Sequence, residues 1–181
     1  PFDCVNNAVN DSIITQNLLR LEKLGYSQIV IIKSTIPVGS CEHYSSKYNF
    51  KLVFNPEFLR ESTTPNEDFE NQDCFVIGTP HTNDFTAVEK MYAKVAVPNA
   101  QYFHLSYREA EMVKYAQNTM LASRVALANM IYDACEHNGV NYEKVRRIAF
   151  DRFDIIGNHL VQVPGPDGER GFGGKCLPKD I

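Results

Sequence analysis

The stretch Ile29-Val30-Ile31-Ile32, which breaks at Ser34-Thr35-Ile36-Pro37-Val38-Gly39, decides the fold class of this chain. A short, continuous apolar run that ends in turn-forming residues is typical of a strand buried on both faces of a sheet. Helical spacing of apolar residues precedes it and ends at Gly25, a natural helix cap. Because apolar strands alternate with helices, we expect an open, largely parallel α/β sheet. Further strands are predicted at 51–54, 74–77 and 102–105, and helices at 11–24, 40–48 and 84–95.

One long helix is predicted over residues 107–137, which contain neither Gly nor Pro, and a shorter helix over 142–150. Residues 163–168 are rich in turn formers and are predicted to be a loop. The long helix has apolar residues on more than one side, which favours a dimer through this helix or burial against a further domain. These residues are Met112, Tyr115, Ala116, Met120, Val125, Ala128 and Ile131.

The composition narrows the class of protein. The chain has 181 residues, a formal charge of −4 and 44% hydrophobic residues, as expected of a globular protein with a substantial core. Without a basic run, nucleic acid and anionic membranes are not expected partners. No segment reaches the length of a membrane span and no signal pattern is seen, so a cytoplasmic location is expected. Five cysteines without a CxxC pair predict free thiols and no metal site.

The segment richest in potentially reactive side chains is Gly171-Phe172-Gly173-Gly174-Lys175-Cys176-Leu177-Pro178-Lys179-Asp180. Three glycines in four residues let the backbone pass close to a ligand. They lead to one cysteine, Cys176, with a lysine on either side and a carboxylate four residues later. Cationic neighbours stabilise a thiolate, so these residues fit a nucleophilic cysteine, while a buried thiol in a turn remains the alternative.

Two further segments carry charged pairs four residues apart. Glu57 and Glu61 in Asn55-Pro56-Glu57-Phe58-Leu59-Arg60-Glu61 share one face if a helical turn follows the proline. In that case the two carboxylates either bind a ligand or act as a base, or they belong to a solvated acidic face. Lys114 and Asn118 lie one turn apart on the long helix, where they form an anion or oxyanion clamp or decorate the surface.

Together these segments resemble the UDP-glucose/GDP-mannose dehydrogenase family, which consists of NAD-dependent four-electron oxidoreductases. The resemblance rests on residues 34–39, 55–61, 114–118 with Arg124 beyond them, and 171–180, in matching order and spacing. It implies that residues 1–105 are the second part of an NAD-binding Rossmann-like domain. Residues 106–181 are then the central long helix and the catalytic-loop segment, which form the dimerisation region. The family's nucleotide-sugar domain follows this helix.

The resemblance also implies roles for individual residues. Cys176 matches the nucleophile that forms a thiohemiacetal and then a thioester at the sugar C6. Lys114 and Asn118 match the pair that contacts the substrate and stabilises negative charge at C6. Glu57 matches the proposed general base of thioester hydrolysis, and Asp180 and Thr35 match residues that hold a catalytic water or support the site. Thr35, Glu61 and Lys179 match NAD contacts, and Glu57, Phe58, Leu59, Arg60, Glu61, Lys114, Asn118 and Gly173 match the substrate-binding positions.

Three features depart from the family pattern. The Gly-rich dinucleotide fingerprint would precede Pro1 and the C-terminal sugar domain is missing, so both ends look cut and residues 1–181 alone are expected to be inactive. The turn-rich loop at 163–168 is longer than expected. Where the family often has Arg-Ile-Gly, whose Arg reaches the partner subunit's substrate, this chain has Ile155-Ile156-Gly157. Arg152 and Arg170 are candidate replacements.

Within the family, oxidation of UDP-glucose to UDP-glucuronate is the preferred expectation, from residues 58–61 and the GFGG form of the catalytic loop. GDP-mannose and UDP-N-acetylmannosamine stay open as substrates. A non-catalytic relative is a second hypothesis, and acyl transfer by a Cys/His pair is a third. His159 is the histidine nearest to Cys176 in the sequence, and its context gives no sign that it orients a thiol.

Overall fold

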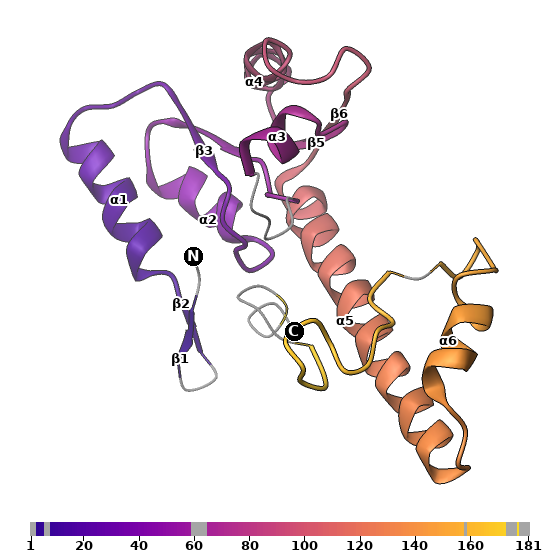
Figure 1. Ribbon diagram of the computed structural model, residues 1–181. Helices are drawn as coiled ribbons and strands as arrows, with labels where there is room; N and C mark the ends of the chain where they lie inside the picture. The colour runs from indigo at the N-terminus through magenta and orange to yellow at the C-terminus, as the bar shows by residue number, and fades with distance from the viewer. Residues whose placement is uncertain (1–2, 6–7, 59–64, 158, 173–176, 178–181) are drawn as a thin grey trace. The chain divides into compact units, whose positions relative to one another are not determined.

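The computed structural model describes residues 1–181 apart from 1–2, 6–7, 59–64, 158, 173–176 and 178–181 (Figure 1). The chain forms two compact units, Pro1–Lys114 and Tyr115–Ile181. The first unit contains the β-sheet, and the second contains most of the long helix.

A four-stranded sheet of order β3-β4-β5-β6 organises the first unit. Its strands are β3 (Ile29–Ile32), β4 (Lys51–Phe54), β5 (Cys74–Gly78) and β6 (Gln101–Leu105), at the places predicted. β3 pairs with β4 in parallel, and so does β5 with β6. The expectation of a largely parallel sheet is corrected at the centre, where β4 and β5 are antiparallel and pair through Phe54 and Gly78.

The connection between β4 and β5, residues 55–73, is long enough for a parallel or an antiparallel pair, so its path in space decides the pairing. In its described part the connection contains one helix, α3 (Pro65–Glu70), of six residues. A parallel crossover needs a dozen or more residues that pass over a face of the sheet, usually as a helix. The two strands instead run toward one another and overlap only at their carboxyl ends, so the sheet is mixed.

Alternate strand residues enter two different hydrophobic clusters, because successive side chains of a strand point to opposite faces. Leu52 and Phe54 of β4 lie in one cluster, whereas Val53 lies in the other. Ile32 is buried, but Ile29 is only partly buried, so the prediction of complete burial on both faces fails at this edge of the sheet.

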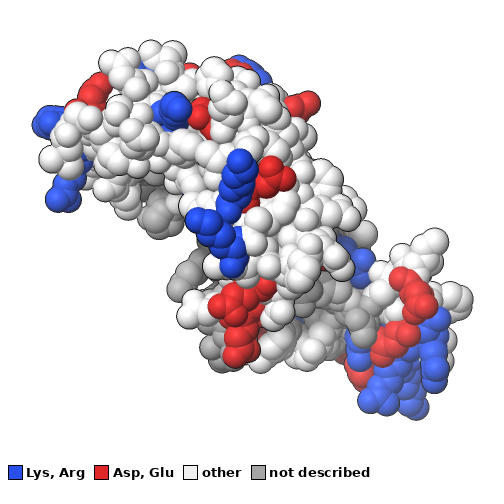
Figure 2. Space-filling model, turned by 90° about the horizontal axis from the view of Figure 1, so that it is seen from above, with Lys and Arg blue, Asp and Glu red and all other residues white. Residues whose placement is uncertain are grey.

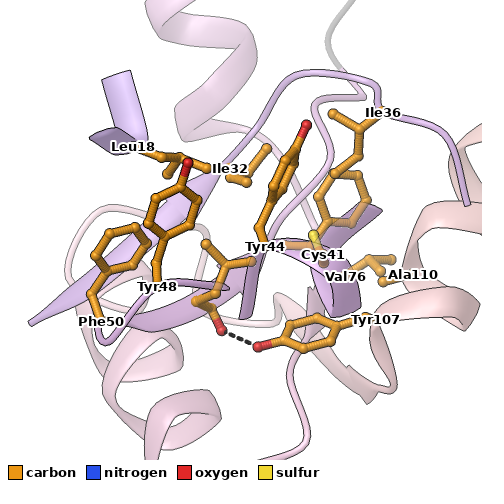
Figure 3. Close-up of a cluster of buried hydrophobic side chains, with 12 residues drawn as sticks. Leu18, Ile32, Ile36, Cys41, Tyr44, Tyr48, Phe50, Val76, Tyr107 and Ala110 are labelled. Atoms are coloured by element: carbon orange, nitrogen blue, oxygen red, sulfur yellow. Dashed lines mark hydrogen bonds between the residues drawn. The ribbon is translucent and has the colours of Figure 1, made fainter. Parts of the chain in front are cut away.

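The first cluster lies between the sheet and three helices (Figure 3). α1 (Ser12–Lys23) contributes Leu18, α2 (Ser40–Lys47) contributes Cys41 and Tyr44, and α5 (Tyr107–His137) contributes its first turn. There the Tyr107 hydroxyl donates a hydrogen bond of 2.7 Å to a backbone carbonyl of β4. The helix α4 (Thr82–Tyr92) and Phe69 of α3 cover the other face.

The chain begins with an antiparallel pair that the sequence did not predict. It joins β1 (Asp3–Val5) to β2 (Ala8–Asn10), before α1. All the predicted helices are present, with ends that differ by a few residues at most from those predicted.

In the second unit, the later part of α5 packs against α6 (Tyr142–Ala149). The Asn141 side chain caps α6 by accepting a 3.0 Å hydrogen bond from the Lys144 amide. The predicted loop is a turn, in which the Gly165 amide donates to the Glu169 carbonyl over 2.8 Å. The hydrophobic core of this second unit consists of Ala128, Cys135, Tyr142, Phe150, Val161 and Val163.

On the molecular surface, basic and acidic side chains lie beside one another on the face drawn in Figure 2.

Candidate active site

The carboxyl ends of β3 and β4 place three polar side chains together. Ile32 pairs with Phe54 in the parallel ladder, so the residues that follow them leave the sheet side by side. The Lys33 Nζ lies 2.9 Å from the Asn55 Oδ1 and 3.1 Å from the Glu57 Oε2. Ligands of open α/β sheets bind outside the carboxyl ends of parallel strands, which makes this edge the candidate site.

Asn55 is buried, with 1% of its surface exposed, and its amide and both polar side-chain atoms have partners. Its amide donates to the Ile32 carbonyl over 2.9 Å, and its Nδ2 donates to the Val76 carbonyl over 2.8 Å. The Tyr92 hydroxyl donates to its Oδ1 over 2.7 Å. A buried side-chain amide whose hydrogen-bonding groups are all paired in this way fixes the positions of the groups that it contacts.

Glu57 directs its two carboxylate oxygens to different partners. The Phe58 amide donates to Oε1 over 3.1 Å, while Oε2 faces Lys33. The side chain of Glu57 is 35% exposed, so it is a half-buried, ion-paired carboxylate and not part of a freely solvated acidic face. The helical turn considered after Pro56 is absent over the described residues Glu57 and Phe58, which are irregular. Glu61 lies outside the described residues.

Lys114 and Asn118 are both buried, with 8% and 3% of their surface exposed, so neither is surface decoration. The Lys114 Nζ lies 5.3 Å from the centroid of the Phe58 ring, a favourable position for a cation over an aromatic face. Lys114 ends the first unit, and Asn118 lies one turn further along α5, in the second.

Glu111, one turn before Lys114 on α5, is a structurally important residue that was not predicted. It is fully buried, and its Oε2 and Oε1 accept hydrogen bonds of 2.5 and 2.9 Å from the amides of Gly39 and Cys41. A carboxylate at a helix N-terminus satisfies its free amides and its dipole. Glu111 thereby anchors α2 and the loop before it, which contains Thr35.

Thr35 lies in the loop after β3 and is partly buried. This position fits a dinucleotide, because such cofactors bind at the carboxyl ends of strands. The pyrophosphate normally needs a Gly-rich turn, and residues 1–24 contain no glycine. Thr35 therefore lies at the edge of the sheet where such a cofactor would bind, and its contact with NAD stays a prediction.

The remaining predicted site residues lie outside the described residues. They are Leu59, Arg60, Glu61, Gly173, Cys176, Lys179 and Asp180.

In the second unit, Arg124 of α5 donates 3.0 Å hydrogen bonds to the carbonyls of His159 and Gly157, and so anchors the segment after α6. Arg170, a candidate replacement for the missing arginine, pairs with Asp133 at 2.5 Å and lies 5.1 Å from the Tyr132 ring centroid. Arg152, the other candidate, is exposed.

Two described thiols, Cys41 and Cys74, are poor candidates for a nucleophile. Burial, and then the charge of Glu111, raise the pKa of Cys41 far above its ordinary value, so this thiol stays protonated. Burial also raises the pKa of Cys74. Within the ranges that the structure describes, no group of three His, Cys, Asp or Glu residues is placed to hold a metal. No described helix is long and apolar enough to cross a membrane.

Comparison with known proteins identifies the family of this chain. Residues 11–96 match the NAD binding domain of the UDP-glucose/GDP-mannose dehydrogenase family, and residues 108–181 match the central domain of the same family. NAD, the predicted cofactor, is therefore the cofactor of the matching domain.

Individual relatives and structures give the same result. The chain is 33% identical to the UDP-glucose 6-dehydrogenase of Rickettsia prowazekii, over 84% of this chain and 35% of that relative. It is 32% identical to that of Pseudomonas aeruginosa, again over 84% of this chain and 35% of the relative. A UDP-glucose dehydrogenase structure from Pyrobaculum islandicum matches with a TM-score of 0.78 and 29% identity, covering 96% of this chain and 40% of that one.

A UDP-D-ManNAc dehydrogenase from Pyrococcus horikoshii shares the fold, with a TM-score of 0.83 and 23% identity over 99% of this chain and 43% of that one. The chain thus spans about a third of the length of the curated relatives that it matches. Because two domains of one family match residues 11–96 and 108–181, the chain belongs to the UDP-glucose/GDP-mannose dehydrogenase family.

Proposed function

We propose that the protein to which this chain belongs oxidises the C6 alcohol of UDP-glucose to the carboxylate of UDP-glucuronate in two NAD-dependent steps. The observation that carries this proposal is the burial of Lys114 and Asn118, one turn apart on α5. Burial holds the ammonium and the amide in fixed positions, where they can act as preorganised hydrogen-bond donors. The relatives named UDP-glucose 6-dehydrogenase support the choice of sugar.

In the first half of the reaction, Lys114 and Asn118 hold the C6 hydroxyl and stabilise the negative charge that grows on its oxygen as the proton leaves. A cation and an amide fixed in a buried site stabilise such charge more strongly than water does. NAD, when bound, accepts one hydride from C6 in each of the two oxidations. Thr35 is the described residue that would contact this cofactor.

In the second half, Cys176 adds to the C6 aldehyde as a thiolate and gives a thiohemiacetal, whose oxidation leaves a thioester. Water then attacks the thioester carbonyl, one of its protons passes to Glu57, and the Cys176 thiolate leaves. The products are the carboxylate and the regenerated cysteine. Asp180 and Thr35 hold the attacking water in this scheme.

We also propose that the protein is a homodimer through α5. Apolar side chains remain exposed along this helix in the second unit, among them Leu127 at 57% and Met130 at 65%. They line an apolar groove of about 580 Å³ together with Ile131, Ala134, Cys135, Asn138 and Val140. Exposed apolar patches of this kind mark interaction surfaces. Sedimentation of the full-length protein tests this proposal, and a monomer contradicts it.

The activity is tested by NADH production from the full-length protein with UDP-glucose. Two NADH per sugar are expected, with loss of carboxylate product in Cys176→Ser and unchanged turnover in the matched control Cys74→Ser. Turnover of GDP-mannose or UDP-N-acetylmannosamine instead would keep the mechanism and change the substrate. If no nucleotide sugar reacts, the protein is a non-catalytic relative. Acyl transfer from a thioester donor without NADH would favour the Cys/His alternative.

A further inference from the structure

Lys33 is the first residue after β3, and none of the family motifs discussed above gives it a role. We propose that Lys33 is a positioning residue that holds the Glu57 carboxylate in the orientation needed to accept a proton from the attacking water. This inference rests on the proposed thioester mechanism. It concerns the hydrolytic step alone, which makes it separable from the two oxidations.

Four neighbours determine where the Lys33 ammonium lies. The Nζ donates to the Asn55 Oδ1 over 2.9 Å and pairs with the Glu57 Oε2 at 3.1 Å. It also lies over two aromatic faces, 5.5 Å from the centroid of Tyr92 and 5.7 Å from that of Phe69. A lysine on a flexible stem is ordinarily mobile, and contacts on this many sides hold its charge at one point.

The groups that hold Lys33 are themselves fixed. Asn55 is buried between β3 and β5 by its bonds to the carbonyls of Ile32 and Val76. Tyr92, which contributes one of the two aromatic faces, also donates to Asn55 over 2.7 Å. The position of the cation is therefore set by groups that the sheet and α4 hold in place.

Glu57 needs such a fixed partner because its own backbone is irregular. The Phe58 amide donates to Oε1, and Lys33 contacts Oε2, so the carboxylate plane is defined by two contacts on different oxygens. Each carboxylate oxygen has a second acceptor site, and a general base requires one of these to face the water. Without Lys33 the carboxylate loses the contact that orients Oε2, and proton transfer slows.

The test uses the full-length protein and the variant Lys33→Met, which keeps an apolar stem between the aromatic rings and removes the charge. Kcat on UDP-glucose is expected to fall about 10- to 100-fold, because a misplaced base loses much of its effect. The ratio kcat/KM is expected to stay near the wild-type value, because the oxidations precede the affected step. Mass spectrometry of quenched reactions is expected to show the thioester on Cys176, as in Glu57→Gln.

Two further variants make the result specific. The double variant Lys33→Met/Glu57→Gln is expected to be no slower than Glu57→Gln alone, because both changes act on one step. Lys33→Arg keeps a cation and is expected to recover part of the loss. Lys51→Met is the matched control, since Lys51 pairs with Asp84 at 3.5 Å from the other end of β4. Its effect is expected on stability, without thioester accumulation.

The outcomes separate this inference from the proposed function. If wild type does not oxidise a nucleotide sugar, the proposed function fails. If wild type turns over and Lys33→Met lowers kcat/KM without accumulating thioester, or leaves kcat unchanged, the role of Lys33 is refuted. Should Lys33→Met fail to fold, Lys33→Gln replaces it, because it keeps a hydrogen-bond donor for Asn55. Loss of folding in both variants assigns Lys33 to stability and also overturns the proposal.

Discussion

Replacing Glu111 by alanine removes the carboxylate that joins α5 to the N-terminus of α2. Its two oxygens accept hydrogen bonds of 2.5 and 2.9 Å from the Gly39 and Cys41 amides, and its side chain is fully buried. Gly39 has a φ of 94°, a conformation that favours glycine, so the loop is already shaped to present its amide. We expect Glu111→Ala to loosen α2 locally more than any exposed substitution on α5.

The size of the effect follows from the two bonds. A buried donor left without a partner costs about 1–3 kcal/mol, and loss of a helix cap costs about 0.5–2 kcal/mol. Because Gly39 is only partly buried, water can reach one of the two amides. We therefore expect a loss of about 3 kcal/mol, which corresponds to a factor of about 100 in the opening equilibrium of α2.

Hydrogen exchange of the full-length protein measures this opening directly. The amides of residues 39–44 are expected to exchange about 100-fold faster in Glu111→Ala than in wild type. Glu111→Gln keeps one carbonyl acceptor and turns an NH₂ group toward the other amide, so an acceleration of about 10-fold is expected. Glu136→Ala, at an exposed position on the same helix, is the control. Unchanged protection of α2 in Glu111→Ala would refute this reasoning.

Three further changes test the packing of α5 and α6. A Cβ at Gly78 would lie 2.6 Å from the Cβ of Ala110, so Gly78→Ala is expected to destabilise the protein by about 1–3 kcal/mol, measured as a lower apparent Tm. Tyr107→Phe removes a buried 2.7 Å hydrogen bond and is expected to cost about 1 kcal/mol in the same assay. Hydrogen bonds and charge from Arg146 lower the pKa of Glu143 from 4.5 to about 2. The stabilisation of α6 by this pair is therefore present above pH 4.5 and is lost as the pH falls through about 2, which an NMR titration of Glu143 checks.

Each of these changes has a matched control. Gly78→Ala combined with Ala110→Gly is expected to cost less than the sum of the single variants, and strict additivity would contradict the steric explanation. Tyr26→Phe removes a hydroxyl from an exposed tyrosine and is expected to change Tm little. In Arg146→Met the titration of Glu143 is expected to move upward, and an unchanged midpoint would assign the low pKa to another cause.

Some residues of the candidate site were predicted from the sequence, and others were not. Glu57, Lys114 and Asn118 were recognised because their motifs resemble a family, whereas Lys33 and Glu111 belong to no segment that attracted attention. A signal for Glu111 was present, since Glu111, Lys114 and Asn118 share one face of the helix at spacings of three and four. Lys33 is the first residue past an apolar strand, but its partner Asn55 is 22 residues away, and only the pairing of the strands shows that they meet.

The sequence alone determined which segments are strands and which are helices, because the spacing of apolar residues and the positions of turn-forming residues are local properties of the chain. The positions of β3, β4, β5 and α5 could be predicted for this reason. The antiparallel β4–β5 pair could not, since it depends on how a connection folds back in space. Likewise, tertiary structure alone decided that Lys114 and Asn118 are buried and that Glu57 meets Lys33. Burial and ion pairing depend on which distant segments come together, and no local pattern contains that information.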